Sequence, residues 1–211
     1  MKKDYAKRTF ITVLVMIMCS LLSTTAFARS IEENGGVNNS GDLWQQLYSL
    51  PPFKFKIHKE GIGYGSCPVY TAPSEDAYRC AGGNATCQTN AKMDDAGFVA
   101  GWLLVRYETN NGGVRVGYIP PKYVRGFKSS MYPHFGFIPA TADNTIYVTD
   151  NPMSHTGAFA VLDPGVDFYI LSKYDYYKKN GLEWWYIQCV VDGKVACGFI
   201  DCGTSSFHLG Y

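Results

Sequence analysis

The chain has 211 residues and a formal net charge of +1, with 46% hydrophobic, 15% aromatic and 18% charged residues. This near-neutral balance excludes the basic surface that drives sequence-independent nucleic-acid binding, so no nucleic-acid partner is expected. The aromatic content and the small net charge also exclude an intrinsically disordered chain. With 16 Tyr, 22 Gly and 10 Pro, the composition favours a β-rich, turn-rich protein over a helical bundle.

Residues 1–28 are predicted to be a cleaved export signal. Four basic residues within the first eight precede an apolar run over 10–22, and Ala26 and Ala28 supply the small residues that a signal peptidase reads. The apolar run is short for a bilayer core of about 30 Å. A lipoprotein signal would instead use Cys19. We therefore expect a bacterial protein that is secreted or associated with the cell envelope, and not held in the membrane after cleavage.

Removal of residues 1–28 changes the composition of the chain. It takes away four of the 19 basic residues, one of the 18 acidic residues and one of the seven cysteines, so that 15, 17 and six remain. An even number of cysteines in an exported chain predicts disulfide bonds. The six are Cys67, Cys80, Cys87, Cys189, Cys197 and Cys202.

The first cysteine cluster predicts a local disulfide. A tight turn centred on Gly83 and Asn84 would place Cys80 opposite Cys87 on a hairpin. Directly opposed Cβ atoms lie about 4.5–5.5 Å apart, close to what a disulfide needs. The sequence therefore favours a Cys80–Cys87 bond.

The second cluster leaves two alternatives. Cys189 and Cys197 flank an Asp-Gly turn; a three-residue loop would oppose the two thiols, whereas a two-residue loop would place them on opposite faces. If they pair, Cys67 and Cys202 are left for a third bond. No C-x-x-C spacing occurs, so no zinc or other metal site is predicted, and no cofactor is expected.

The N-terminal segment, 29–61, begins with a polar stretch. Apolar spacing over 42–50 predicts one short amphipathic helix, which Pro51 ends. The alternation over 53–57 predicts a strand or an extended segment. From about residue 62 onward, short apolar alternations separated by frequent turns predict many short strands.

Two stretches of the chain resemble each other and predict a tandem duplication. Each contains an early Val/Ile-Tyr element, a later strand led by Trp, a turn, and a closing Gly-aromatic-Ile element. The corresponding residues are Tyr70 and Tyr147, Trp102 and Trp185, and Gly117 and Gly198, at separations of 77, 83 and 81.

The order of these motifs resembles the bacterial SH3-like domain, over about 62–126 and 142–204. The resemblance implies an all-β fold with two tandem small SH3-like β-barrels of five or six strands each, at 62–126 and 142–211, joined by a linker at 127–141. It also implies a non-enzymatic binding role in the cell envelope, toward peptidoglycan glycan, a peptide or another envelope protein. The sequence does not predict the oligomeric state.

Aromatic side chains in loops are the candidate ligand contacts, because Tyr and Trp offer stiff surfaces with a polar tip. The Tyr-rich stretch before residue 184 supplies one set. The groove that the resemblance implies, between the first long loop and the loop before the Trp strand, supplies the other. Together the candidates are Tyr70, Pro73, Tyr78, Asn151, Tyr174, Tyr176, Tyr177 and Trp184.

The alternative interpretation is an accessory or catalytic component of a peptidoglycan hydrolase. A cysteine hydrolase needs a thiolate beside a histidine. The four histidines, His58, His134, His155 and His208, fall in predicted loops and in no local signature. The six cysteines fit paired sulfurs better than one activated nucleophile. The sequence therefore predicts no catalytic residues.

Overall fold

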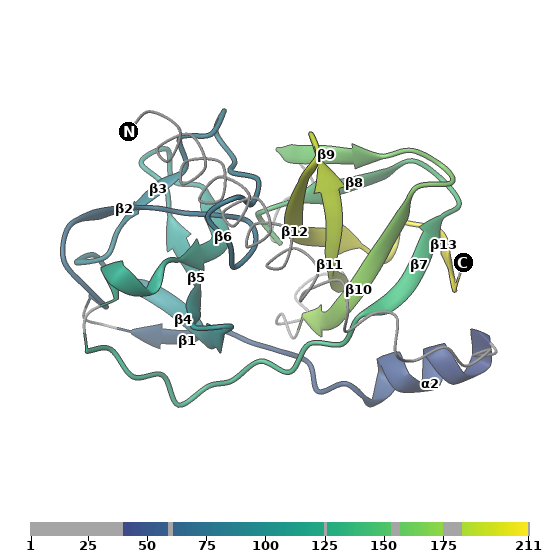
Figure 1. The fold of residues 1–211 in the computed structure, drawn as a ribbon, viewed down its shortest axis with the longest axis horizontal. Coiled ribbons are helices and arrows are strands. Elements are labelled where there is room, and N and C mark those ends of the chain that lie inside the picture. The colour runs from purple at the N-terminus through teal and green to yellow at the C-terminus, as the bar shows by residue number, and fades with distance from the viewer. Residues whose placement is uncertain (1–39, 59–60, 125, 153–156, 175–182, 211) are drawn as a thin grey trace, which may run out of the picture. The chain divides into compact units, whose positions relative to one another are not determined.

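The computed structural model describes residues 40–58, 61–124, 126–152, 157–174 and 183–210, and residues 39–211 form one compact unit (Figure 1). The predicted export signal, Tyr176 and Tyr177 lie outside the described residues. Within the described part the secondary structure is mostly β, with a single α-helix, α2 (Ser40–Ser49), and one 3₁₀ turn, η1 (Pro121–Tyr123). The predicted all-β class and the short N-terminal helix are confirmed. That helix is too short and too polar to cross a bilayer, and the described residues contain no other candidate span.

The first half of the described chain forms a four-stranded antiparallel sheet and a separate two-stranded piece. The sheet has the order β1-β4-β5-β6, and the piece pairs β2 with β3. One bridge, between Tyr70 and Tyr118, joins the end of the piece to β6. The strands are β1 (Lys56–His58), β2 (Ser66–Pro68), β3 (Thr86–Gln88), β4 (Met93–Val99), β5 (Trp102–Glu108) and β6 (Val114–Ile119).

The second half forms a seven-stranded antiparallel sheet in the order β13-β7-β10-β11-β12-β8-β9, which curls on itself in Figure 1. Its central hairpin, β11–β12, is paired over eight residues on each strand and turns at Asp192 and Gly193, both of which have positive φ. The strands are β7 (Ile138–Ala142), β8 (Ile146–Thr149), β9 (Ala158–Leu162), β10 (Asp167–Tyr174), β11 (Trp184–Val191), β12 (Lys194–Asp201) and β13 (Phe207–Leu209).

The two halves repeat one strand topology. Counting the Tyr70–Tyr118 bridge, the first half runs β1-β4-β5-β6-β2-β3, and the second runs β7-β10-β11-β12-β8-β9 with β13 added at its edge. The fourth strand of each copy is bulged at the same place, between Asp95 and Gly97 in β4 and between Ile170 and Ser172 in β10. We call these halves the first and second copy.

Strand pairing corrects two of the correspondences expected from the sequence. In the first copy Leu104 faces Tyr118, and in the second Tyr186 faces Phe199. Trp102 therefore corresponds to Trp184, one residue earlier than expected. Likewise Tyr70 pairs with Tyr118 as Thr149 pairs with Phe199, so the counterpart of Tyr70 is Thr149 and not Tyr147.

The copies also begin earlier than the sequence suggested. Strand β1 lies before residue 62 and pairs with β4, so it belongs to the first copy. Strand β7 starts at Ile138, inside the predicted linker 127–141, and pairs with β10. The strand or extended segment predicted over 53–57 overlaps β1, whereas the proline-containing composition around β7 gave no sign of its five residues.

The two copies share one hydrophobic core cluster. It combines side chains of the first copy, such as Leu104 and Tyr118, with side chains of the second, such as Tyr186 and Phe199. The Tyr186 hydroxyl donates to the Tyr118 hydroxyl at 3.3 Å, and both rings are fully buried. Backbone hydrogen bonds also cross between the copies, from Val116 N to Asp150 O and from Tyr78 N to Val195 O.

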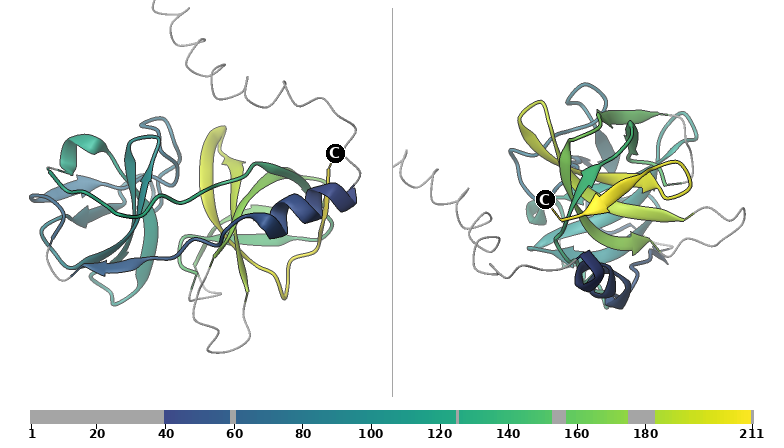
Figure 2. Two further views of the ribbon diagram at one scale, coloured as in Figure 1. Left: turned by 90° about the horizontal axis from the view of Figure 1, so that it is seen from below. Right: turned by 90° about the vertical axis from the view of Figure 1, so that its right-hand side faces the viewer.

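Each copy is also crossed by a segment from elsewhere in the chain. Phe53, which precedes β1, bridges to Tyr174 of the second copy. In return Met131, which precedes β7, lies against Gly97 of the first copy. Helix α2 contacts β7 and β13, and Figure 2 shows it beside these strands in both views. The N-terminal segment therefore packs on the second copy rather than on the first.

Candidate binding hollow

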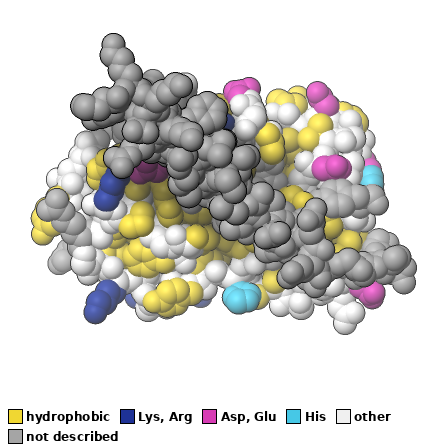
Figure 3. All heavy atoms as spheres, in the orientation of Figure 1, with side chains coloured by type: hydrophobic (Ala, Val, Ile, Leu, Met, Phe, Trp, Pro, Cys, Tyr) yellow, Lys and Arg dark blue, Asp and Glu magenta, His cyan; other side chains and the backbone are white. Residues whose placement is uncertain are grey.

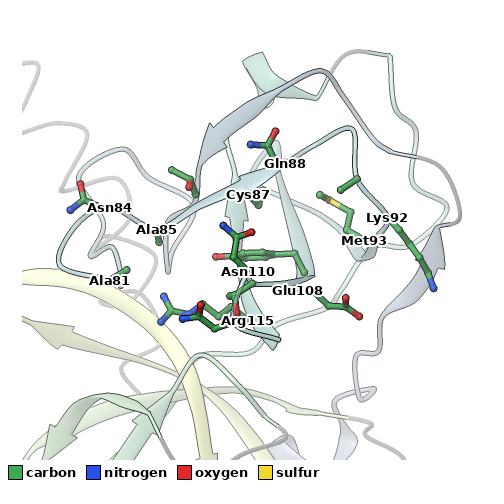
Figure 4. A pocket seen from close by; sticks show the side chains of 15 residues that line it. Ala81, Asn84, Ala85, Cys87, Gln88, Lys92, Met93, Glu108, Asn110 and Arg115 are labelled. Atoms are coloured by element: carbon green, nitrogen blue, oxygen red, sulfur yellow. The ribbon is translucent and has the colours of Figure 1, made fainter. Parts of the chain in front are cut away.

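The first copy contains a polar hollow of about 380 Å³ where β2–β3 diverges from the β5–β6 hairpin. In Figure 4, Gln88 of β3 lies across from Glu108 and Arg115, Asn84 and Ala81 lie at one end, and Lys92 and Met93 lie at the other. The lining comprises Ala81, Asn84, Ala85, Thr86, Cys87, Gln88, Ala91, Lys92, Met93, Tyr107, Glu108, Thr109, Asn110, Asn111 and Arg115.

A well-ordered turn holds two amides at the edge of this hollow. Thr109 N donates to Gly113 O at 2.7 Å, and the Thr109 hydroxyl both donates to Gly113 O and accepts from Gly113 N, at 3.1 Å each. Gly112 supplies the positive φ of 73° that closes the turn. As a result Asn110 and Asn111 project from a fixed backbone.

The opposite wall is held in place by Arg79. Its guanidinium donates to Ala85 O at 2.7 Å and to Val69 O at 3.3 Å, and it lies 5.1 Å from the centre of the Tyr70 ring. These contacts satisfy two carbonyls of a loop that forms no strand ladder. The loop that carries Asn84 is therefore anchored even though only short strands flank it.

The lining combines free amides with separated charges. In the described part of the chain, no side-chain hydrogen bond uses the amides of Gln88, Asn110 or Asn111, and all three residues are exposed. Lys92 and Glu108 are exposed as well. Arg115 is half-buried and forms a 3.5 Å ion pair with Asp150. The hollow thus presents hydrogen-bond donors and acceptors without a single dominant charge.

Asp150 lies behind this wall at the contact between the copies. Burial raises the pKa of its carboxyl above the ordinary value, and the nearby Arg115 opposes that shift. Burial likewise raises the pKa of the Cys80 thiol, which forms a hydrogen bond with Asp150. Arg115 therefore links the edge of the hollow to the shared interface between the copies.

The structure does not gather the aromatic residues expected at a ligand site. Tyr174 and Trp184 are 4% and 2% exposed and belong to the shared core, so the expectation that they are exposed contacts is wrong. They occupy the end of β10 and the start of β11, on the face that packs against the first copy. A position inferred from loop composition alone could not show which face these strand ends present.

The remaining described candidates are partly buried and do not line the hollow. The ring of Tyr70 packs edge-on against Trp102, and the ring of Tyr78 stacks on Phe159 at 5.6 Å. Pro73 is half-buried in the intervening loop. The backbone N–H of Asn151 donates to the Thr149 hydroxyl at 3.0 Å. Whether these residues contact a ligand stays a prediction.

The predicted cysteine pairings do not match the strand register. Cys87 faces Cys67 across β2–β3, and their Sγ atoms are 3.5 Å apart, so Cys80 is not the residue opposite Cys87. The segment after Cys80 forms a left-handed turn instead of a hairpin, closed by the bond from Gly83 N to Arg79 O. Ala81 in this turn adopts a φ of 56°, a left-handed conformation that is uncommon for alanine.

The structure decides between the two-residue and three-residue turns that the sequence left open for the second cysteine cluster. Cys189 faces Ala196, and Cys197 faces Gln188, which is the two-residue turn. The thiols therefore point to opposite faces, Cys189 into the core of the second copy and Cys197 into the shared core. Cys67 is opposed by Cys87 and not by Cys202. All six thiols are free in this structure.

A histidine, an aspartate and a serine meet beneath β1. Asp95 is fully buried at the β4 bulge, and its carboxylate contacts His58 Nε2 of β1 and accepts a hydrogen bond from the Ser129 hydroxyl. In nucleophilic catalysis the base lies between the nucleophile and the carboxylate. In this group the carboxylate lies between the other two side chains, so the arrangement fastens β1 and the 127–137 segment to the sheet.

The other titratable groups offer little for nucleophilic or metal chemistry. Burial raises the pKa of Cys189 and of Cys202 to about 12, which disfavours their thiolates at neutral pH. Across the described ranges, no group of three or more His, Cys, Asp or Glu residues could hold a metal ion.

On the face seen in Figure 3, charged side chains are sparse and hydrophobic ones gather over the four-stranded sheet.

A second hollow, of about 470 Å³, lies over β10 and β11. Asp167, Tyr169, Gln188 and Val190 are among its lining residues, and Asp167 already accepts a hydrogen bond from Thr141 at 2.7 Å. Fewer uncommitted polar groups therefore face this hollow. The first hollow is the stronger candidate for binding.

Sequence reasoning missed the amides of Gln88, Asn110 and Asn111. Asn-Asn-Gly-Gly at 110–113 separates the Trp-led strand from the Gly-aromatic-Ile element, and two amides in one turn were the one available signal. Gln88 carried no such signal, because its approach to the turn depends on contacts between distant segments.

No protein-family model matches this chain, and searches of curated proteins and of solved structures find no match either.

Proposed function

We propose that this chain is an exported, non-enzymatic binding protein whose two copies are SH3-like barrels, and that the polar hollow binds a glycan or peptide of the bacterial cell envelope. The observation that carries the proposal is the set of uncommitted amides, Gln88, Asn110 and Asn111, around a preformed hollow. Preformed concave sites with a few oriented polar groups are the usual form of ligand pockets.

The repeated strand order supports the SH3-like interpretation. Six antiparallel strands follow the same order in each copy, with β13 added to the second, and the same bulge occurs in β4 and in β10. In each copy a glycine in the last hairpin strand allows another strand to cross closely: Gly117 beside Tyr70 O and Gly198 beside Thr149 O, where an added Cβ would lie 2.9 Å from each oxygen. Small barrels use such glycines and bulges where strands bend.

The chemistry of the lining favours a polar, largely uncharged ligand. Side-chain amides donate and accept hydrogen bonds, and so match both sugar hydroxyls and peptide groups. The exposed Ala91 adds apolar surface of the kind that the non-polar faces of such ligands cover. A volume of about 380 Å³ is within the usual range for small-ligand sites.

The direct test is sedimentation of the purified protein with isolated peptidoglycan at moderate salt. The wild type should co-sediment, and N110A/N111A should bind roughly thirtyfold more weakly, since two hydrogen bonds at about 1 kcal/mol each are lost. Q45A/Q46A, which removes two exposed amides from α2, is the matched control and should bind like the wild type. Absence of wild-type binding would refute the envelope-ligand proposal.

Two further measurements narrow the ligand and separate the alternative. Peptidoglycan stripped of its stem peptides tests whether the glycan is enough for binding. An assay for soluble fragment release tests the hydrolase interpretation, and release that is abolished by thiol alkylation would replace the binding proposal. We expect binding without release.

A further inference from the structure

We propose that Cys67 and Cys87 form a disulfide bond that links β2 to β3 at the wall of the polar hollow. The two residues are direct partners in the strand register, and their Sγ atoms lie 3.5 Å apart. Both side chains are buried, at 2% and 6% exposure, and Cys87 also lines the hollow.

The backbone geometry allows the bond with little movement. Opposed residues on antiparallel strands have Cβ atoms about 4.5–5.5 Å apart, and a disulfide requires about 3.5–4.5 Å. Strands β2 and β3 have only three residues each, so a small local shift meets no long ladder that would resist it. The sulfurs already face each other across the pair.

The same contact prepares one thiol for reaction. A hydrogen bond from the Cys87 thiol lowers the pKa of Cys67 and correspondingly raises the pKa of Cys87. A thiolate is the reactive form in disulfide chemistry. The other cysteines lack such a neighbour: burial raises the pKa of Cys197 above the ordinary value, and no sulfur–sulfur contact besides Cys67–Cys87 occurs in the described part.

The bond forms by thiol–disulfide exchange with a disulfide R–S–S–R, such as oxidised glutathione or an oxidising protein of the compartment. One cysteine thiolate attacks one sulfur of R–S–S–R, forms a mixed disulfide and displaces R–S⁻. The second cysteine then attacks the mixed disulfide, forms the Cys67–Cys87 bond and displaces the second R–S⁻. The two cysteine protons pass to the two released thiolates, so two cysteines are oxidised and one R–S–S–R is reduced to two R–SH.

The consequence is a stiffer wall for the hollow. Among the described residues, the Tyr70–Tyr118 bridge is the only strand pairing between the two-stranded piece and β6. A covalent link between Cys67 and Cys87 closes the loop that carries Arg79 and Asn84, and a closed loop samples fewer conformations. This inference needs no ligand and stands or falls independently of the proposed function.

Mapping the bond in the purified protein tests the inference. After incubation with oxidised glutathione and alkylation of remaining thiols, trypsin should release peptide 60–79, with Cys67, joined to peptide 80–92, with Cys80 and Cys87. Because the second peptide has two cysteines, C80S and C87S are compared. The joined pair should persist in C80S and disappear in C87S.

Three results would overturn the inference: a bond internal to peptide 80–92, a joined pair that survives in C87S, or wild-type protein whose Cys67 is fully alkylated after oxidation. If C87S fails to fold, the wild type and C80S alone still decide between these outcomes. Hydrogen exchange of the amides in β2 and β3 gives a second readout. Exchange should slow on oxidation in the wild type and in C202S, and remain unchanged in C67S.

Discussion

Each copy contains the same kind of hairpin, and the copies differ in the strands that pack over it. In the second copy the covering strands β8 and β9 have four and five residues, and β8 joins β12 through the pair Thr149–Phe199. In the first copy the equivalent strands, β2 and β3, have only three residues each and join β6 through the Tyr70–Tyr118 bridge. The polar hollow opens beside this shorter pair. The copy with the shorter covering strands therefore carries the candidate site, while the other copy supplies much of the core.

This contrast shows that two copies of one strand topology can present different surfaces. The hairpin and the bulge recur because they set the strand geometry of each copy. The covering strands vary in length, and the uncommitted amides of the hollow come from β3, in Gln88, and from the β5–β6 turn, in Asn110 and Asn111. Function on a small scaffold generally depends on such local departures, and not on the shared topology.

Substitution at the bulge should have the largest effect. Gly97 has a φ of 104°, and a Cβ at this position would overlap the carbonyl of Met131. We expect G97A to lower the free energy of unfolding by about 3 kcal/mol or more, through backbone strain and overpacking. The equivalent residue of the second copy is Ser172, whose hydroxyl donates to Pro51 O at 3.3 Å.

Chemical denaturation of G97A beside S172A measures this difference. S172A loses one hydrogen bond and should cost only about 1 kcal/mol. Equal effects of the two substitutions would show that the two bulges are packed equally tightly against the segments that cross them. The contrast between the copies would then fail.

The paired glycines test the shared hairpin. At Gly198 an added Cβ would lie 2.6 Å from Val148 Cγ1 and 2.9 Å from both Phe159 Cε1 and Thr149 O. We expect G198A and G117A each to destabilise the protein by about 1–3 kcal/mol, because neither site has room for a methyl group.

G41A is the control for this pair, because a Cβ at Gly41 meets nothing within 4 Å. Its unfolding free energy should stay within about 0.5 kcal/mol of the wild type. A stable G117A variant, with G198A destabilised, would mean that the two hairpins are not equivalent.

Alkaline pH should weaken the shared core through its buried tyrosines. Burial raises the pKa of Tyr186 well above the ordinary 10.0. Above pH 10 the unfolded chain loses this proton while the folded chain keeps it, so stability is fully present below pH 10 and falls as the pH rises. We expect Y186F to reduce the slope of stability against pH by about 1.4 kcal/mol per pH unit.

Thermal unfolding between pH 9 and pH 11 gives this slope for the wild type and the variants. Y147F is the matched control, since the Tyr147 side chain is 62% exposed, and its slope should equal that of the wild type. An unchanged slope in Y186F would show that the interface between the copies admits water.

The sequence was most informative where structure depends on neighbouring residues. Helix α2, the turn at Asp192 and Gly193, and the all-β class all follow from local spacing and turn chemistry. The duplication was visible as well, but its register could be fixed only by strand pairing. A shift of one residue exchanges Trp184 for Trp185, and with it the face of the strand.

The cysteine partners and the hollow were beyond local reasoning. Cys87 pairs with a residue 20 positions away across a bridge of two three-residue strands, a separation that no turn motif specifies. The left-handed turn after Cys80 replaced a hairpin that Gly83 and Asn84 would equally have permitted. Gln88 and Asn110 line one hollow because the folded chain brings distant segments together.

The position of helix α2 has a consequence for the order in which the molecule is completed. Trp44 of α2 stacks on Phe207 of β13, with ring centres 5.9 Å apart, and Leu43 and Leu209 share one core cluster. The apolar face of the earliest described element is therefore fully covered only when the last described strand is in place. Contacts of such long sequence separation slow folding. Helix α2 can contact β7 before β13 has been synthesised, but a nascent chain that stalls before residue 207 leaves the helix without its final partner.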